Sequence, residues 1–180
     1  MLSARLATYL CSEQTTPRMI FSNSININIL EFIRAGHFDY IKPGHTKAWI
    51  LNNFPDPDDI GIGDNVRTAK IWFYGNIELH FDKEELSLIY SDSIIDLDGG
   101  KSLEINKWIF NDSTRLSLSK FINELNIEGI DFYKKTEEND NGCLRLTIFK
   151  SNVLLTFTNQ ESKTNNPNDF KLTSFNLMRQ

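Results

Sequence analysis

The alternation of hydrophobic and polar residues predicts a chain of short helices and strands. Hydrophobic residues recur at helical spacing over residues 25–34 and 47–54, directly after Ser24 and Thr46, which are good helix caps. Gly36 fits the end of the first of these segments. We therefore predict two short helices near the start of the chain.

In the second predicted helix, three large residues fall on one side. These are Trp49, Ile50 and Phe54. Residues 56–68, which follow this helix, are polar and rich in Asp and Gly, so they are predicted to form a loop.

The next segment has the period of strands. Residues 77–81 alternate apolar and polar side chains, and apolar runs over 70–74 and 86–90 flank them across short polar turns. Such closely spaced runs predict an antiparallel meander.

The remainder of the chain repeats this order. Residues 103–110 are read as a strand or a short helix. Ser117 precedes a helical pattern that includes Phe121, Ile122 and Leu125. Three further strands are predicted over 143–150, 153–157 and 170–178. A polar segment over 137–142 precedes the first, a turn at Ser151-Asn152 follows it, and a polar loop over 159–169 precedes the last.

The similarity of the two halves indicates a duplicated unit. A cap and two hydrophobic positions recur at equal spacing, as Thr46, Ile50 and Phe54 in one half and Ser117, Phe121 and Leu125 in the other. Three strands with one apolar face are marginal alone, and two such sheets joined edge to edge would support each other. We therefore predict one α+β domain over 1–180, with αα-βββ repeats over 24–92 and 113–178, a continuous antiparallel sheet and helices on one face.

The first half carries a pattern of capping, turn and core residues. It runs Gly44-x-Thr46, then Ile50, Phe54-Pro55-x-Pro57, Trp72-x-Tyr74-Gly75 and Glu78-Leu79-x-Phe81. This pattern resembles the αα-βββ unit of the BamE/SmpA outer-membrane lipoproteins and of the beta-lactamase-inhibitor proteins (BLIP-like proteins). Inhibitors of that kind carry the unit in tandem around a concave sheet, which implies a protein-binding surface. Residues 71–81 also resemble small bacterial immunity-type proteins.

Composition narrows the classes of partner. The chain has 180 residues, a formal net charge of −5 and a charged fraction of 24%, which is typical of a globular protein. An acidic chain does not favour nucleic acid, which binds basic faces, and no apolar run is long enough for a membrane helix. The two cysteines, Cys11 and Cys143, do not form a disulfide framework. We read the first eleven residues as lacking an export signal and predict a cytoplasmic protein.

No pattern of catalytic or metal-ligating residues was found in the sequence. The three histidines do not have metal-ligand spacing, and glycine-rich phosphate loops are absent, so no cofactor is predicted. Glu78 and His80, two residues apart, could form an acid–base pair, but no nucleophile lies near them in the sequence. We therefore do not expect an enzyme.

The predicted partner is another protein. We expect it to contact Trp72, Tyr74, Glu78 and His80 on the strands, together with the acidic loop residues Asp58, Asp59 and Asp64. The preferred hypothesis is an immunity or inhibitor role. A BamE-like envelope assembly factor and a small ligand-binding domain remain as alternatives.

Overall fold

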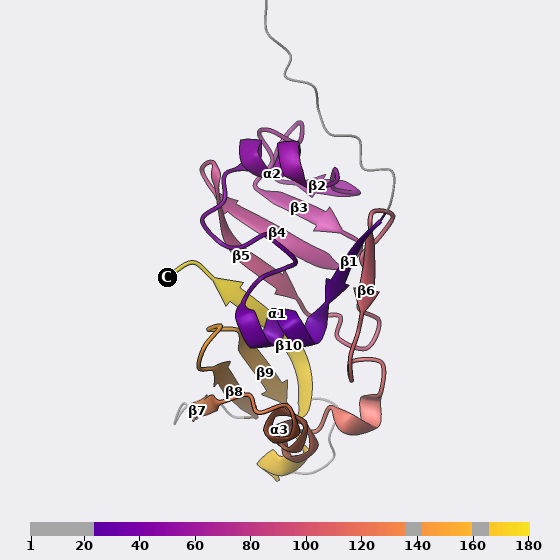
Figure 1. Cartoon of the computed structure of the whole chain (residues 1–180), viewed down its shortest axis with the longest axis vertical. Coiled ribbons are helices and arrows are strands. Elements are labelled where there is room, and N and C mark those ends of the chain that lie inside the picture. Colours follow the sequence, from indigo (N-terminus) through magenta and orange to yellow (C-terminus); the bar gives the residue numbers. More distant parts are fainter. Residues whose placement is uncertain (1–23, 136–141, 160–165) are drawn as a thin grey trace, which may run out of the picture.

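The computed structural model describes residues 24–135, 142–159 and 166–180. Figure 1 shows the arrangement of the helices and strands. In chain order they are β1 (Ile25–Asn28), α1 (Ile29–Ala35), α2 (Lys47–Asn53), β2 (Asp59–Gly61), β3 (Ile71–Tyr74), β4 (Ile77–Asp82), β5 (Glu85–Ser91), β6 (Leu103–Asn106), α3 (Leu118–Ile127), β7 (Phe132–Lys135), β8 (Cys143–Ile148), β9 (Leu154–Thr158) and β10 (Lys171–Met178). Short 3-10 helices lie at Ser113–Arg115 and Pro167–Asp169.

The main sheet is antiparallel and is built from two meanders. Its eight strands follow the order β2-β3-β4-β5-β10-β9-β8-β7, and β1 and β6 form a separate parallel pair. The meanders meet at β5 and β10, where Phe175 is in register with Ser91 and Leu177 with Ile89. The predicted α+β class with one continuous antiparallel sheet is confirmed.

The two halves also share their hydrogen bonds. In each, the start of a helix is tied to the strand at the centre of the sheet by two backbone bonds. In the first half Lys47 N donates to Glu84 O at 2.8 Å and Leu86 N to His45 O at 2.8 Å; in the second, Leu118 N donates to Phe170 O at 2.8 Å and Leu172 N to Leu116 O at 3.0 Å. Helix and sheet are therefore joined in the same way twice.

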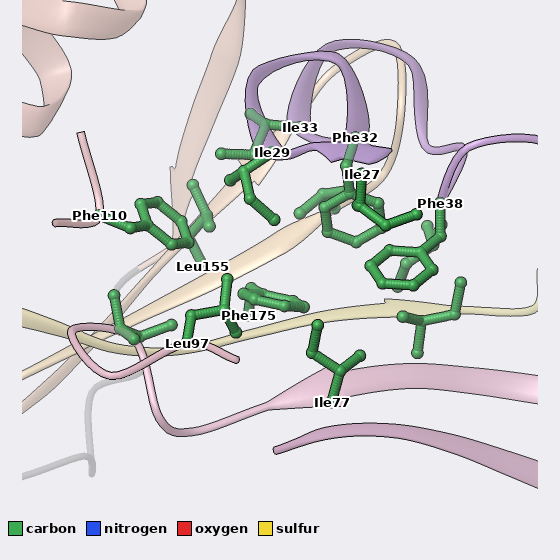
Figure 2. Close-up of a cluster of buried hydrophobic side chains, with 14 of the residues drawn as sticks. Ile27, Ile29, Phe32, Ile33, Phe38, Ile77, Leu97, Phe110, Leu155 and Phe175 are labelled. Atoms are coloured by element: carbon green, nitrogen blue, oxygen red, sulfur yellow. The ribbon is translucent and has the colours of Figure 1, made fainter. Parts of the chain in front are cut away.

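The described helices pack on one face of the sheet, as expected. An aromatic contact joins each helix, or the residue that caps it, to that face. The ring centroids of Phe32 in α1 and Phe175 lie 5.2 Å apart, those of Phe54 at the end of α2 and Tyr74 5.5 Å, and those of Phe121 in α3 and Phe157 5.6 Å. Figure 2 shows the core beneath α1, where Phe32 and Ile29 point toward Phe175 on β10. Fully buried aromatic and branched side chains of this kind are the main stabilising component of the fold.

The beginning of the described chain differs from the prediction. A helix over 25–34 is wrong in its first four residues, because these form β1, which pairs in parallel with β6. The β-branched isoleucines there favour a strand. The cap of α1 is Asn28, whose side chain accepts a hydrogen bond from Glu31 N. The predicted stop is confirmed, since Gly36 adopts a left-handed conformation with φ 72°.

Two strands of the sheet were missed, and both are edge strands. β2 has three residues and lies inside the predicted loop over 56–68, while β7 has four. Each half therefore has four sheet strands. Of the side chains predicted to share one side of α2, Ile50 and Phe54 are buried, whereas Trp49 is 38% exposed. Cys11 and most of the polar segments at 137–142 and 159–169 lie outside the described residues.

Candidate functional site

The candidate site is the face of the eight-stranded sheet opposite the helices, which we call the open face. One row of side chains on this face crosses every strand, each in register with the next. In strand order the row is Asp59, Phe73, Glu78, Tyr90, Asn176, Leu154, Thr147 and Tyr133. These positions alternate with the buried ones, because successive side chains on a strand point to opposite faces.

A second row adds apolar side chains beside the first. Ile71, His80 and Leu88 are in register on β3, β4 and β5. These three residues are partly exposed, and at the edge of the sheet Tyr133 is 50% exposed. The open face therefore presents aromatic and aliphatic groups among polar ones, which is the composition of a protein interface.

Glu78 and His80 form the most polar part of the open face. His80 Nε2 lies 2.5 Å from Glu78 Oε2, and both side chains are a little over a quarter exposed. The ring of His80 also meets Tyr90 edge to face, with centroids 6.4 Å apart. Burial raises the pKa of Tyr90, and the carboxylates of Asp92 and Glu78 raise it further, so Tyr90 keeps its hydroxyl proton at neutral pH.

The prediction that Trp72 and Tyr74 contact a partner is wrong. Trp72 and Tyr74 are fully buried on the helix side of β3, and a partner cannot reach them. Trp72 Nε1 donates to Val66 O at 2.9 Å, and the Tyr74 hydroxyl donates to Pro55 O at 2.7 Å. Both polar groups thus have partners inside the protein, as buried polar groups require.

The three predicted acidic contacts lie in different settings. Asp58 is partly buried, and its carboxylate accepts hydrogen bonds from Gly75 N at 2.9 Å and Lys101 N at 3.1 Å, so it joins separate turns. Asp59 is exposed and belongs to the row on the open face. Asp64 is exposed in the following loop. Asp59 lies in the same row as Glu78, with Phe73 between them, whereas Asp58 has a structural role.

The sequence reasoning missed Phe73 and Tyr90, which take the place of Trp72 and Tyr74 on the open face. All four residues of β3 are hydrophobic, so the alternation cannot choose which pair is buried. The signal lies in the neighbouring strand, since Phe73 is in register with the polar Glu78 and Trp72 with the apolar Leu79.

Two hollows lie away from the Glu78–His80 pair. One of about 500 Å³ opens between the segment after β5 and the start of β10, and Asp92, Asp96, Thr114 and Lys171 are among its lining residues. Another of about 360 Å³ lies near the end of β10 and is lined in part by His37 and Arg179. Because His80 lines neither, neither hollow places a bound molecule beside the pair.

Among the described residues, no three side chains of His, Cys, Asp or Glu come together as a metal site would require. None of the helices in the described part of the chain has the length and apolar character needed to cross a membrane. Comparisons with models of protein families, with curated proteins and with solved structures found no match for this chain.

Proposed function

We propose that this protein is a non-enzymatic protein-binding module of the immunity or inhibitor type, which occludes a partner protein with its open face. The observation that carries the proposal is the row of side chains that crosses all eight strands, from Asp59 to Tyr133. A broad platform of this kind suits contact with another macromolecule, whereas a small substrate is usually enclosed in a cleft.

The chemistry of the row supports the same proposal. Aromatic residues such as Phe73 and Tyr90 are the usual centres of binding energy at interfaces, and polar neighbours such as Glu78 supply specificity. The net charge of −5 favours a more basic partner through electrostatic steering.

The test is capture of a partner from the native host by the full chain and by face variants. Tyr90→Asp and Leu154→Asp place a charge at the centre of the open face, while Lys120→Glu changes an exposed residue of α3 and serves as the matched control. We expect the two face variants to lose a protein that the wild type and the control retain. A protein captured equally by all four, or no protein retained at micromolar concentration, contradicts the proposal.

A small ligand-binding domain is the second candidate, because of the hollow of about 500 Å³ beside Lys171. Its lining combines the Lys171 amine with the carboxylates of Asp92 and Asp96, which suits a small polar molecule. A thermal-shift screen of small metabolites tests it, and stabilisation that Lys171→Ala abolishes would favour it. The envelope assembly role and the cytoplasmic location stay predictions from the sequence.

A further inference from the structure

The sheet is divided into an acidic half and a basic half. As the structure describes them, β2 to β5 contain Asp and Glu but neither Lys nor Arg, and β7 to β10 contain Lys and Arg but neither Asp nor Glu. The acidic residues are Asp59, Glu78, Asp82 and Glu85; the basic ones are Lys134, Lys135, Arg145 and Lys171. The boundary falls between β5 and β10, at the middle of the sheet.

Much of this division is displayed on the open face. Asp59 and Glu78 belong to the row described above, and Asp82 follows Glu78 and His80 on the same side of β4. In the other half, Arg145 is in register with Thr156 on the same face of β8 and β9. The open face therefore carries acidic side chains on β2 and β4 and the basic side chain of Arg145 on β8.

We propose that a second copy of this chain docks on the open face, related to the first by a two-fold axis that runs parallel to the strands between β5 and β10. Such an axis places β7 to β10 of one copy over β2 to β5 of the other. Each acidic half then faces a basic half, and every contact is made twice, as in other isologous dimers. In this arrangement β8 lies over β3 and β9 lies over β4. Arg145 on β8 therefore comes within one strand and two residues of Glu78 on β4 of the other copy.

The apolar side chains of the open face also favour the binding of a second copy of the chain. Ile71, Phe73, Leu88, Tyr90 and Leu154 are partly exposed there, and docking would remove them from water. Eight strands at about 4.8 Å spacing give a face about 34 Å wide, which is comparable with the width of a standard interface of about 800 Å² per copy. Charge complementarity then sets the orientation of the two copies.

This inference goes beyond the proposed function. A second copy and a different partner would compete for the same residues, so the two can be separated by experiment. A chain that stays monomeric would overturn the dimer and leave the partner proposal standing. A chain that forms the dimer but captures no host protein would support the dimer and overturn the partner proposal.

Sedimentation of the full chain over a range of concentrations tests the inference. We expect a monomer–dimer equilibrium that weakens as salt rises, because the opposed charges are then screened. Glu78→Arg and Arg145→Glu should each raise the dimer dissociation constant about tenfold or more, since each sets like charges against each other. Lys120→Glu on α3 should leave the constant unchanged.

The sharpest test is to mix the two single variants. In the proposed arrangement, a Glu78→Arg copy and an Arg145→Glu copy place opposite charges at both contacts, so the mixture should form a heterodimer that neither variant forms alone. Circular dichroism of each variant confirms that it is folded before mixing. A monomeric wild type overturns the inference, as does a dimer that ignores both substitutions or a mixture that stays monomeric.

Discussion

Thr46 and Ser117 hold the same place in the two halves of the sheet. Each precedes a helix, and each forms a bridge with the first residue of the strand that ends its half, Glu85 in one case and Lys171 in the other. They differ in one respect. The Thr46 hydroxyl accepts a hydrogen bond from Trp49 N at 3.2 Å, whereas the Ser117 side chain makes no capping bond.

The difference predicts unequal effects of removing the two hydroxyls. Thr46→Ala should lower the free energy of unfolding by about 1 kcal/mol, because an N–H in the first turn of α2 loses its acceptor. Ser117→Ala should have a clearly smaller effect. Urea unfolding of both variants measures this, and equal losses would show that the hydroxyl of Thr46 does not cap α2.

The matching positions of Thr46 and Ser117 before their helices were visible in the sequence because they depend on local residues. The same holds for β4, where Ile77, Leu79 and Phe81 alternate with polar residues and fix which face is buried. Glu78 and His80 were therefore placed correctly on the face opposite the apolar stripe. Local patterns predict an element well when the two faces of that element differ in polarity.

Where both faces are apolar, the sequence could not decide. β3 reads Ile-Trp-Phe-Tyr, and only pairing with β4 shows that Trp72 and Tyr74 are buried. The edge strands β2 and β7 were missed for a related reason, since strands of three and four residues carry too few positions to show a period. β1 depends on pairing with β6, which is distant in sequence. These features arise from tertiary contacts.

Asp58 and Asp59 are adjacent in sequence, but Asp58 is expected to stabilise the fold and Asp59 to contribute little to stability. Asp58→Ala should lower the free energy of unfolding by about 1–3 kcal/mol, because Gly75 N and Lys101 N lose their acceptor. Asp59→Ala should change stability by about 0.5 kcal/mol or less, since Asp59 is exposed on an edge strand. Urea unfolding compares the two, and equal losses would contradict a clamp at Asp58.

The environment of His45 indicates that the folded protein loses stability in mild acid. Burial of the ring, and then the charges of Lys42 and His37, lower the pKa of His45 below its usual value of 6.5. Its Nδ1 is buried without a hydrogen-bond partner among the described residues. The unfolded chain therefore binds the proton more readily, and stability falls as pH drops below about 6.5 toward the lower folded pKa.

Comparison with His45→Gln isolates this effect. Other groups contribute equally to both proteins, so the wild type should lose more stability than the variant between pH 7.5 and pH 5.5. Chemical unfolding at the two pH values measures the difference. The His45 ring packs against Trp49 with the two centroids 4.1 Å apart, so native-state fluorescence should also change with pH in the wild type and less in the variant. Parallel stability losses would rule out this role of His45.

Trp72 is buried and Phe73 is partly exposed on the same strand, so substitutions at the two positions should affect stability and binding separately. Trp72→Ala removes a fully buried ring that packs against Phe81 with the two centroids 4.4 Å apart. It should lower the free energy of unfolding by about 3–5 kcal/mol. Phe73→Ala should cost about 1 kcal/mol or less in stability and weaken capture of the partner by about 1 kcal/mol or more, because its ring lies on the open face. Unfolding and affinity measurements on both variants give the two quantities independently. If Phe73→Ala binds the partner as well as the wild type, the partner does not contact the acidic half of the open face at this position.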